Sequence, residues 1–263
     1  MEDQFTRTKM LLGDAADQLW NKRVAVFGVG GVGGYVCEVL ARSGIGAIDI
    51  IDNDRVAISN LNRQIIATRA TVGQEKVQVM KDRILSINPD IKVTARQCFF
   101  LPENADTFNF NEYDYVVDAV DTVAAKISII MKAQSANVPV ISAMGAGNKL
   151  DPARFKVADI YETDVDRLAK VMRRELKKRG VSHLKVVYSD EKPLTPLFQP
   201  EAEADMDELN MVEGVEAGIK QSAAQAGKSS RRQTPGSLAF VPAVAGCIIG
   251  GEVIKDLVGI NDI

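Results

Sequence analysis

Short apolar runs and longer amphipathic stretches alternate along the first part of the chain. The runs that indicate buried strands are Val24–Phe27, a run ending at Asp52, Ile91–Gln97, Tyr113–Asp118 and Val138–Ala143. The stretches with helical spacing are Tyr35–Ser43, Gln74–Asn88, which Pro89 ends, and Ala124–Asn137. This alternation predicts an α/β fold with a doubly wound, largely parallel sheet and right-handed crossovers.

The alternation becomes less regular beyond Asp151. Phe155–Ile160 predicts one more strand, and Asp164–Arg179 predicts a helix in which basic side chains outnumber acidic ones. From Ser189 to Pro235 the composition is that of a loop, acidic at first and basic near its end. We therefore predict a flexible insertion of mixed charge in this part of the chain.

The last apolar segment, Ala239–Ile254, could be mistaken for a membrane span. It is shorter than the roughly 20 apolar residues that a span needs, and it contains Pro242 and Glu252. We predict a buried closing helix and no stable membrane association. The predicted organisation is a single domain, 1–263, made of a nucleotide-binding core (1–150), a basic helix region (151–188), the flexible insertion (189–235) and the closing helix (236–263).

A glycine-rich turn follows the first predicted strand. Its glycines are Gly28, Gly30, Gly31 and Gly33. Glycine lets phosphates approach the backbone N–H groups at the start of the next helix, where the helix dipole favours negative charge. Asp52 ends the next strand, where a carboxylate can accept hydrogen bonds from a ribose. These features predict a nucleotide site and leave NAD, FAD and ATP open.

Composition excludes several kinds of chemistry. The chain has 263 residues, 46% of them hydrophobic and 25% charged, as in ordinary globular proteins. Its three cysteines are scattered and His183 is its only histidine, which argues against a disulfide framework, a zinc site and a Ser–His triad. We expect Cys37 and Cys247 to be small core residues and leave Cys98 unassigned. The first residues lack an apolar leader, so we expect a cytoplasmic protein.

Several polar positions together form a more specific pattern. Ser59–Gln64 with Lys76, the acids Asp118 and Asp121, and Phe5–Arg7 near the start resemble the ATP-binding set of the ubiquitin-activating-enzyme superfamily, which includes the sulfur-carrier adenylyltransferases. The resemblance favours ATP and a Rossmann-like ATP-binding half with a C-terminal extension. The ATP-binding residues that it implies are Gly28, Gly30, Gly31, Gly33, Asp52, Asp54, Asn60, Arg63, Gln64, Lys76 and Asp118.

The resemblance also implies roles. Arg63 and Lys76, together with Asn60, would neutralise the triphosphate, and Asp121 would coordinate Mg²⁺. Arg7 would reach across the interface of a homodimer, so the implied catalytic residues are Arg7, Arg63, Lys76 and Asp121. Four of the implied site residues also have a simpler explanation: Arg63 or Lys76 alone would be a solvated charge, and Asp118 or Asp121 a helix cap.

Later segments narrow the resemblance. Val140–Pro152, Leu184–Ser189 and Thr234–Gly246 are similar to the tRNA threonylcarbamoyladenosine dehydratase family. That family implies ATP-dependent cyclisation of the modified adenosine in tRNA through an acyl-adenylate. The alternative is an adenylyltransferase that activates a ubiquitin-like sulfur carrier; NAD-dependent oxidoreduction and a non-catalytic docking role would leave the charged residues unexplained.

The partners follow from the same resemblance. tRNA is the expected substrate, and sulfur-relay proteins and a monovalent cation are considered as additional components. Clustered Lys and Arg side chains contact nucleic-acid phosphates without regard to sequence. The residues that we predict to bind tRNA are Arg167, Lys170, Arg173, Arg174, Lys177 and Lys178, with Lys228, Arg231 and Arg232 in the insertion. A solvated helix face explains the first six equally well.

Overall fold

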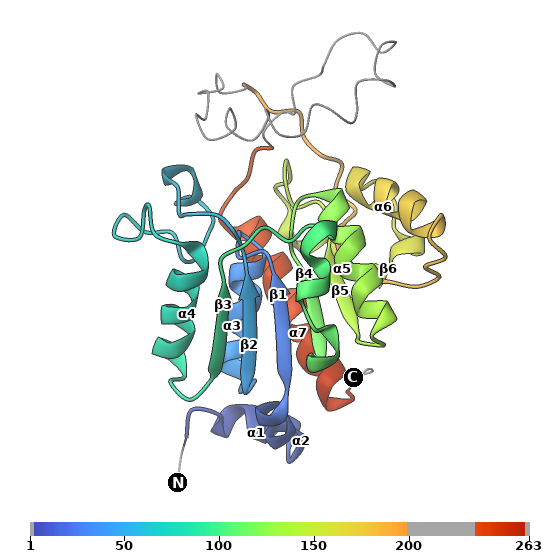
Figure 1. Cartoon of the computed structure of the whole chain (residues 1–263). Coiled ribbons are helices and arrows are strands. Elements are labelled where there is room, and N and C mark those ends of the chain that lie inside the picture. The colour runs from blue at the N-terminus through green and yellow to red at the C-terminus, as the bar shows by residue number, and fades with distance from the viewer. Residues whose placement is uncertain (1–2, 199–234, 261–263) are drawn as a thin grey trace, which may run out of the picture.

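A central sheet organises the chain in the computed structural model, which describes residues 3–198 and 235–260 (Figure 1). Its seven strands lie in the order β3-β2-β1-β4-β5-β7-β6. Six strands run parallel to one another, and β6 at one edge is antiparallel to β7. The strands are β1 Arg23–Phe27, β2 Ala47–Ile51, β3 Lys92–Arg96, β4 Tyr115–Asp118, β5 Val140–Ala143, β6 Phe155–Asp159 and β7 Lys185–Ser189.

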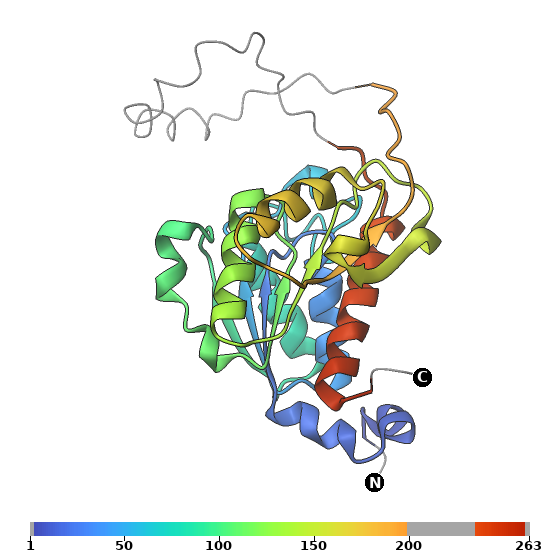
Figure 2. The same cartoon turned by 90° about the vertical axis from the view of Figure 1, so that its right-hand side faces the viewer.

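Helices cover both faces of the sheet, as a doubly wound fold requires. The helices are α1 Thr6–Leu12, α2 Ala15–Gln18, α3 Gly33–Ser43, α4 Lys76–Ile87, α5 Val123–Ser135, α6 Arg167–Lys177 and α7 Phe240–Val258. With the molecule turned by 90°, α3 and α7 are seen on one face and α5 on the other (Figure 2). The two short helices α1 and α2 precede β1 and lie at the edge where the parallel strands begin (Figure 1).

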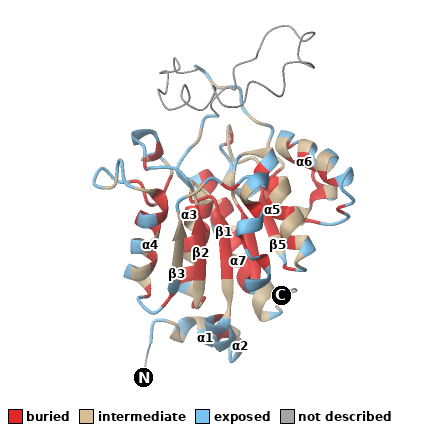
Figure 3. Ribbon diagram, in the orientation of Figure 1, coloured by how far each residue is buried: buried red, intermediate tan, exposed pale blue. Residues whose placement is uncertain are grey.

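The sheet and the inner faces of these helices form the core (Figure 3). One cluster joins alternate residues of the central strands to α3, α4 and α7, and a second joins the opposite face to α5. A third joins α6 and β7 to α5. At the end of β1, the ring of Phe27 packs against those of Phe100, Phe108 and Phe110, with ring centroids 4.9 to 5.8 Å apart. Apolar residues thus cover both faces of the central strands, which fixes the position of their polar ends.

The closing helix α7 packs closely on α3 because glycines face that helix. A Cβ at Gly250 would lie 2.7 Å from Cβ of Val39, and one at Gly246 would lie 2.7 Å from Cβ of Tyr35. Among the described residues, no helix is long and apolar enough to cross a membrane. The apolar segment of the sequence is therefore explained by packing against α3 within the fold.

Some predictions differ from the structure. The sequence pattern predicts no strand at Lys185–Ser189, yet β7 lies there, between β5 and β6. Cys37 is buried as expected, but Cys247 is exposed on α7, so its assignment to the core was wrong. The insertion between 199 and 234, with Lys228, Arg231 and Arg232, lies outside the described residues.

Candidate active site

The glycine turn between β1 and α3 is built from contacts that a side chain would prevent. Gly28 has a φ of +90°, and a Cβ there would lie 2.6 Å from the carbonyl oxygen of Ala119. A Cβ at Gly33 would overlap the carbonyl oxygen of Gly28. The turn is therefore pressed against the loop that follows β4, and both segments border the same space at the carboxyl ends of the strands.

Asp52, just after β2, holds this turn in place. One of its carboxylate oxygens accepts a hydrogen bond from the Val29 N–H at 2.7 Å, and the other accepts one from the Asp54 N–H at 2.9 Å. Burial raises the pKa of Asp52 above its ordinary value, although the charge of Lys76 and the two N–H groups act in the opposite direction. A carboxylate has about four acceptor positions, so Asp52 keeps positions with which it could bind a hydroxyl group.

A cavity of about 590 Å³ lies at this edge of the sheet. It is formed by the glycine turn and by the segments that follow β2, β3, β4 and β5. Open α/β sheets bind ligands at this edge. The predicted residues that line the cavity are Gly28, Gly30, Gly31, Asp52, Asp54, Asn60, Arg63, Gln64, Lys76 and Asp121.

Two of the predicted cations border this cavity. The Lys76 ammonium group is almost fully buried and lies 2.6 Å from an oxygen of the more exposed Asp54 carboxylate. Arg63 donates hydrogen bonds to the carbonyl oxygen of Ser59 at 2.9 Å and to the side chain of Asn62 at 3.0 Å. Both cations are thus held by neighbours on the wall of the cavity, where an anionic ligand would meet them.

Two amide side chains complete this wall. Asn60 and Gln64 are both buried, although each is polar. The Asn60 oxygen accepts a hydrogen bond from the Ala57 N–H, whereas the Gln64 oxygen has no hydrogen-bond partner among the described residues. An unsatisfied buried oxygen is uncommon in folded proteins and calls for an explanation. A hydroxyl or amine group of a ligand in the cavity, or a water molecule, would donate a hydrogen bond to the Gln64 oxygen.

Asp118 occupies a different position from the other predicted ATP-binding residues. Its carboxylate is fully buried and accepts hydrogen bonds from Lys126 at 3.1 Å and from Ser142 at 2.5 Å. It does not line the cavity, and neither does Gly33, which is buried at the start of α3. Within the described structure, Asp118 therefore connects β4, α5 and β5, whereas the residues after it, from Ala119 to Thr122, form the wall.

Arg7 is not brought to the cavity within the chain. It is exposed on α1, at the edge of the sheet where the strands begin. The cavity lies at the other edge. A contact between Arg7 and this site would therefore require a second copy of the chain.

The basic helix α6 presents a stripe of cations to solvent. Ala169, Met172 and Leu176 form its buried side. The basic residues predicted to bind tRNA that are exposed are Arg167, Lys170, Arg174, Lys177 and Lys178. Arg173 differs, because it is half-buried and donates a hydrogen bond to the carbonyl oxygen of Thr163 at 2.7 Å. It fastens the helix to the preceding loop, so it belongs to this stripe only in part.

The cavity also has lining residues that the sequence analysis did not identify. They include Asn53, Cys98, Phe99, Phe100, Thr122, Gly147, Pro235 and Ser237. The lining residues after β3 and β5 could have been predicted from the sequence, because the carboxyl ends of parallel strands meet on one side of the sheet. Pro235 and Ser237 carried no such signal, since they are distant in the sequence. Burial raises the pKa of the Cys98 thiol, which gives no support to a nucleophilic role.

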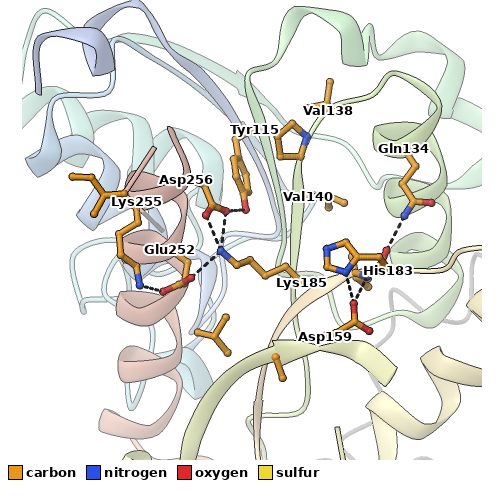
Figure 4. A pocket seen from close by; sticks show the side chains of 15 residues that line it. Tyr115, Gln134, Val138, Val140, Asp159, His183, Lys185, Glu252, Lys255 and Asp256 are labelled. Carbon is orange, nitrogen blue, oxygen red and sulfur yellow. Dashed lines mark hydrogen bonds and ion pairs between the residues drawn. The ribbon is translucent and has the colours of Figure 1, made fainter. Parts of the chain in front are cut away.

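A second cavity, of about 690 Å³, lies at the opposite end of the strands, where β4, β5 and β7 begin (Figure 4). Its charged groups are already paired: Lys185 lies 2.8 Å from Asp256 and 2.9 Å from Glu252, and Tyr115 donates a hydrogen bond to Asp256 at 2.6 Å. These contacts tie α7 to the amino ends of β4 and β7. Although this cavity is larger, we place the active site at the first one, where groups able to bind a nucleotide converge.

Among the described residues, neither cavity holds a metal site made of protein side chains alone. Over residues 3–198 and 235–260, no group of three or more His, Cys, Asp or Glu side chains could hold a metal ion. Magnesium is usually bound by one or two carboxylates together with substrate phosphates. The exposed carboxylate of Asp121 on the cavity wall fits that second arrangement.

Comparisons with known proteins show the family of this chain. A family model described as the ThiF family matches residues 6–263. The tRNA threonylcarbamoyladenosine dehydratase of Bacillus subtilis (strain 168) is 42% identical over 259 residues, which cover 98% of this chain and 95% of the relative. A crystal structure of E. coli tRNA N6-threonylcarbamoyladenosine dehydratase, TcdA, in complex with ATP matches with a TM-score of 0.79 and 30% identity, over 97% of this chain and 94% of that one.

A more distant relative covers only part of the chain. The probable adenylyltransferase/sulfurtransferase MoeZ of Mycobacterium tuberculosis (strain ATCC 25618 / H37Rv) is 38% identical over 128 residues, which cover 49% of this chain and 32% of the relative. The likeness to the dehydratases, in contrast, extends over nearly the full length. The chain therefore belongs to the ThiF family and, within it, to the tRNA threonylcarbamoyladenosine dehydratases.

Proposed function

We propose that this protein catalyses the ATP-dependent cyclisation of threonylcarbamoyladenosine in tRNA. The observation that carries the proposal is the cavity at the carboxyl ends of the strands, in a chain that is similar to a dehydratase over 98% of its length. The solved relative in complex with ATP supports the choice of nucleotide. The reaction consumes ATP and releases AMP and pyrophosphate, and the modified nucleoside loses one water.

The first step is adenylation. An oxygen of the threonyl carboxylate attacks the α-phosphorus of ATP, and the bond to the β-phosphate oxygen breaks to release pyrophosphate. Both reactants are anions, so fixed positive charge must offset their repulsion. Arg63 and Lys76 line the cavity and supply that charge, with Asn60 as a neutral donor. The product is a mixed anhydride between the threonyl carboxyl group and AMP.

The second step closes the ring. A nitrogen of the same side chain attacks the activated carbonyl carbon, its proton is lost, and the bond to AMP breaks. Because nucleophile and electrophile belong to one molecule, proximity supplies much of the rate. No enzyme nucleophile is needed, which is consistent with the raised pKa of the Cys98 thiol at the cavity.

Mg²⁺, a second copy of the chain and tRNA contact complete the proposal. A Mg²⁺ ion bound to the phosphates would neutralise part of their charge, and Asp121, which lines the cavity, would hold it. Arg7 would come from the partner in a homodimer.

The exposed stripe of α6 would contact the tRNA backbone. We also propose a cytoplasmic location, where tRNA is found; sulfur-relay partners and a monovalent cation stay predictions.

A direct experiment tests the proposal. Purified protein is incubated with ATP, Mg²⁺ and tRNA carrying threonylcarbamoyladenosine, and the digested tRNA is analysed by mass spectrometry. We expect the modified nucleoside to lose the mass of one water only when ATP is present. An unchanged mass, together with pyrophosphate release stimulated by a small protein ending in Gly-Gly, would instead support the sulfur-carrier alternative.

A further inference from the structure

Residues Pro235–Ser237, here called the bridging segment, lie shortly before α7 and form part of the wall of the nucleotide cavity. Pro235 and Ser237 both line the cavity. Their position is fixed from two sides by asparagine side chains, Asn62 and Asn148. These two residues come from the segments that follow β2 and β5, so the bridging segment connects two walls of the cavity.

Asn62 links the bridging segment to Arg63. Its amide nitrogen donates a hydrogen bond to the Ser237 carbonyl oxygen at 2.9 Å. Its amide oxygen accepts a hydrogen bond from the Arg63 guanidinium group at 3.0 Å. One side chain thus holds both the backbone of the bridging segment and a cation proposed to bind the triphosphate.

Asn148 holds the other side. Its side-chain oxygen accepts a hydrogen bond from the Gly236 N–H at 2.7 Å, and its own N–H donates one to the Gly236 carbonyl oxygen at 2.7 Å. Its carbonyl oxygen also accepts a hydrogen bond from the Leu194 N–H at 2.7 Å. Asn148 has a φ of 59°, a conformation that Asn adopts more readily than most residues.

Gly147, the residue before Asn148, packs tightly against the bridging segment. A Cβ at Gly147 would lie 2.7 Å from Cβ of Pro235, so the chain before Asn148 touches the bridging segment directly. The hydrogen bonds and this close contact hold the segment beside Arg63. A change at Asn148 should therefore reach the nucleotide even though Asn148 does not line the cavity.

We propose that Asn62 and Asn148 are positioning residues that act together, through the bridging segment, on the binding of ATP. The inference rests on the proposed function only in taking ATP as the nucleotide. Neither residue needs to touch ATP. Asn148 acts through the bridging segment alone, whereas Asn62 acts on both this segment and Arg63.

Calorimetric titration with ATP and Mg²⁺ tests the proposal on the full chain. Asn148→Gly removes the side-chain acceptor and permits the positive φ, and we expect the Kd for ATP to rise about three- to tenfold, the effect of one neutral hydrogen bond. Asn148→Asp keeps the acceptor and should recover most of the affinity. Asn137→Gly is the matched control, because Asn137 has a φ of 54°, is exposed and lies outside the cavity.

A double-mutant cycle tests whether the two asparagines act through the same segment. In an Asn62→Ala background, Asn148→Gly should raise the Kd for ATP less than it does in the wild type. With saturating ATP, the KM for tRNA should stay unchanged in Asn148→Gly. An unchanged Kd in Asn148→Gly, an equal rise in Asn137→Gly, or fully independent effects in the cycle would overturn the proposal. Because ATP binding is measured without tRNA, failure of the wild type to cyclise tRNA would count against the proposed function alone.

Discussion

The Lys126 ammonium group lies 3.1 Å from the Asp118 carboxylate in a region that solvent does not reach, with 1% and 0% of the two side chains exposed. Lys126 also approaches the Ser142 hydroxyl at 3.4 Å and donates a hydrogen bond to the Ala143 carbonyl oxygen at 2.7 Å. Lysine has three N–H donors, and each has an acceptor here. The pair lies behind the cavity wall at Ala119–Thr122 and fastens the end of β4 to α5 and β5.

We expect Lys126→Met to destabilise the fold by about 3–5 kcal/mol, because it leaves the buried Asp118 charge without a partner. Asp118→Asn combined with Lys126→Met removes both charges and should recover a large part of this loss. Chemical denaturation of the three proteins measures the free energies of unfolding. Equal stability of Lys126→Met and the wild type would show that the pair does not support the fold.

Arg63→Ala and Asp121→Ala should lower tRNA cyclisation by roughly 10²–10³-fold while leaving the fold intact, the size of effect expected when one group that stabilises transition-state charge is lost. Arg63 would supply such charge directly, and Asp121 would hold the Mg²⁺ ion that supplies it. The yield of cyclic nucleoside, read by mass spectrometry of digested tRNA, measures the loss. Arg69→Ala is the control, since Arg69 is exposed and outside the cavity. Wild-type yield in either cavity variant would refute the assignment of that residue.

Charge reversal on α6 should weaken tRNA binding. Lys170→Glu and Arg174→Glu change exposed members of the stripe, and each should reduce the dependence of log K on log salt by about 1 if it contacts a phosphate. Lys92→Glu changes an exposed residue on β3, which is the edge strand at the other side of the sheet from β6. It should leave this slope unchanged. If Lys170→Glu and Arg174→Glu behave like Lys92→Glu, the helix is an ordinary solvated surface.

Arg173 requires a separate test. Its hydrogen bond to the Thr163 carbonyl oxygen is internal, so its replacement changes stability as well as charge. Comparing it directly with Arg174 would confuse the two effects.

Glu38 on α3 predicts a pH dependence of stability. Its carboxylate lies 2.6 Å from Arg83 and 2.6 Å from Arg42. Burial by itself would raise the pKa of Glu38, but the hydrogen bonds and charges of the two arginines outweigh it and lower the pKa below 4.5. The stabilisation is therefore complete above the ordinary pKa of 4.5 and is lost as the pH falls through the lower value of the folded state.

Glu38→Gln should reduce the free energy of unfolding by about 1–2 kcal/mol at neutral pH. It should also flatten the fall in stability below pH 4.5. Denaturation curves collected from pH 3 to pH 7 would show both effects. Glu103→Gln, at an exposed position, is the control, and identical pH profiles for Glu38→Gln and the wild type would contradict the expectation.

The sequence indicated the nucleotide-binding half well because its signals are local. The glycine turn, the position of Asp52 and the helix beginning near Lys76 can each be recognised within a few neighbouring residues. β7 was missed because five residues between a basic helix and a loop carry little periodicity. Its place between β5 and an antiparallel edge strand is fixed only by packing, as the cluster that joins β7 to α6 shows.

Long-range contacts explain the remaining differences at the site. Asp118 could be read as a nucleotide ligand or as a helix cap, and its pairing with Lys126 and Ser142 depends on how three elements meet. Pro235 reaches the cavity from a distant part of the sequence for the same reason. Neither relationship leaves a periodic or compositional trace.

The packing of α7 on α3 has a consequence for biosynthesis. Gly246 and Gly250 meet α3 directly, and Pro242 would touch a side chain placed at Gly31 in the glycine turn. The helix that carries this turn is therefore covered by a segment that is synthesised long after it. A nascent chain that ends before α7 would leave one face of α3 open to water, so competence for nucleotide binding should arise only once α7 has been synthesised and has packed on α3.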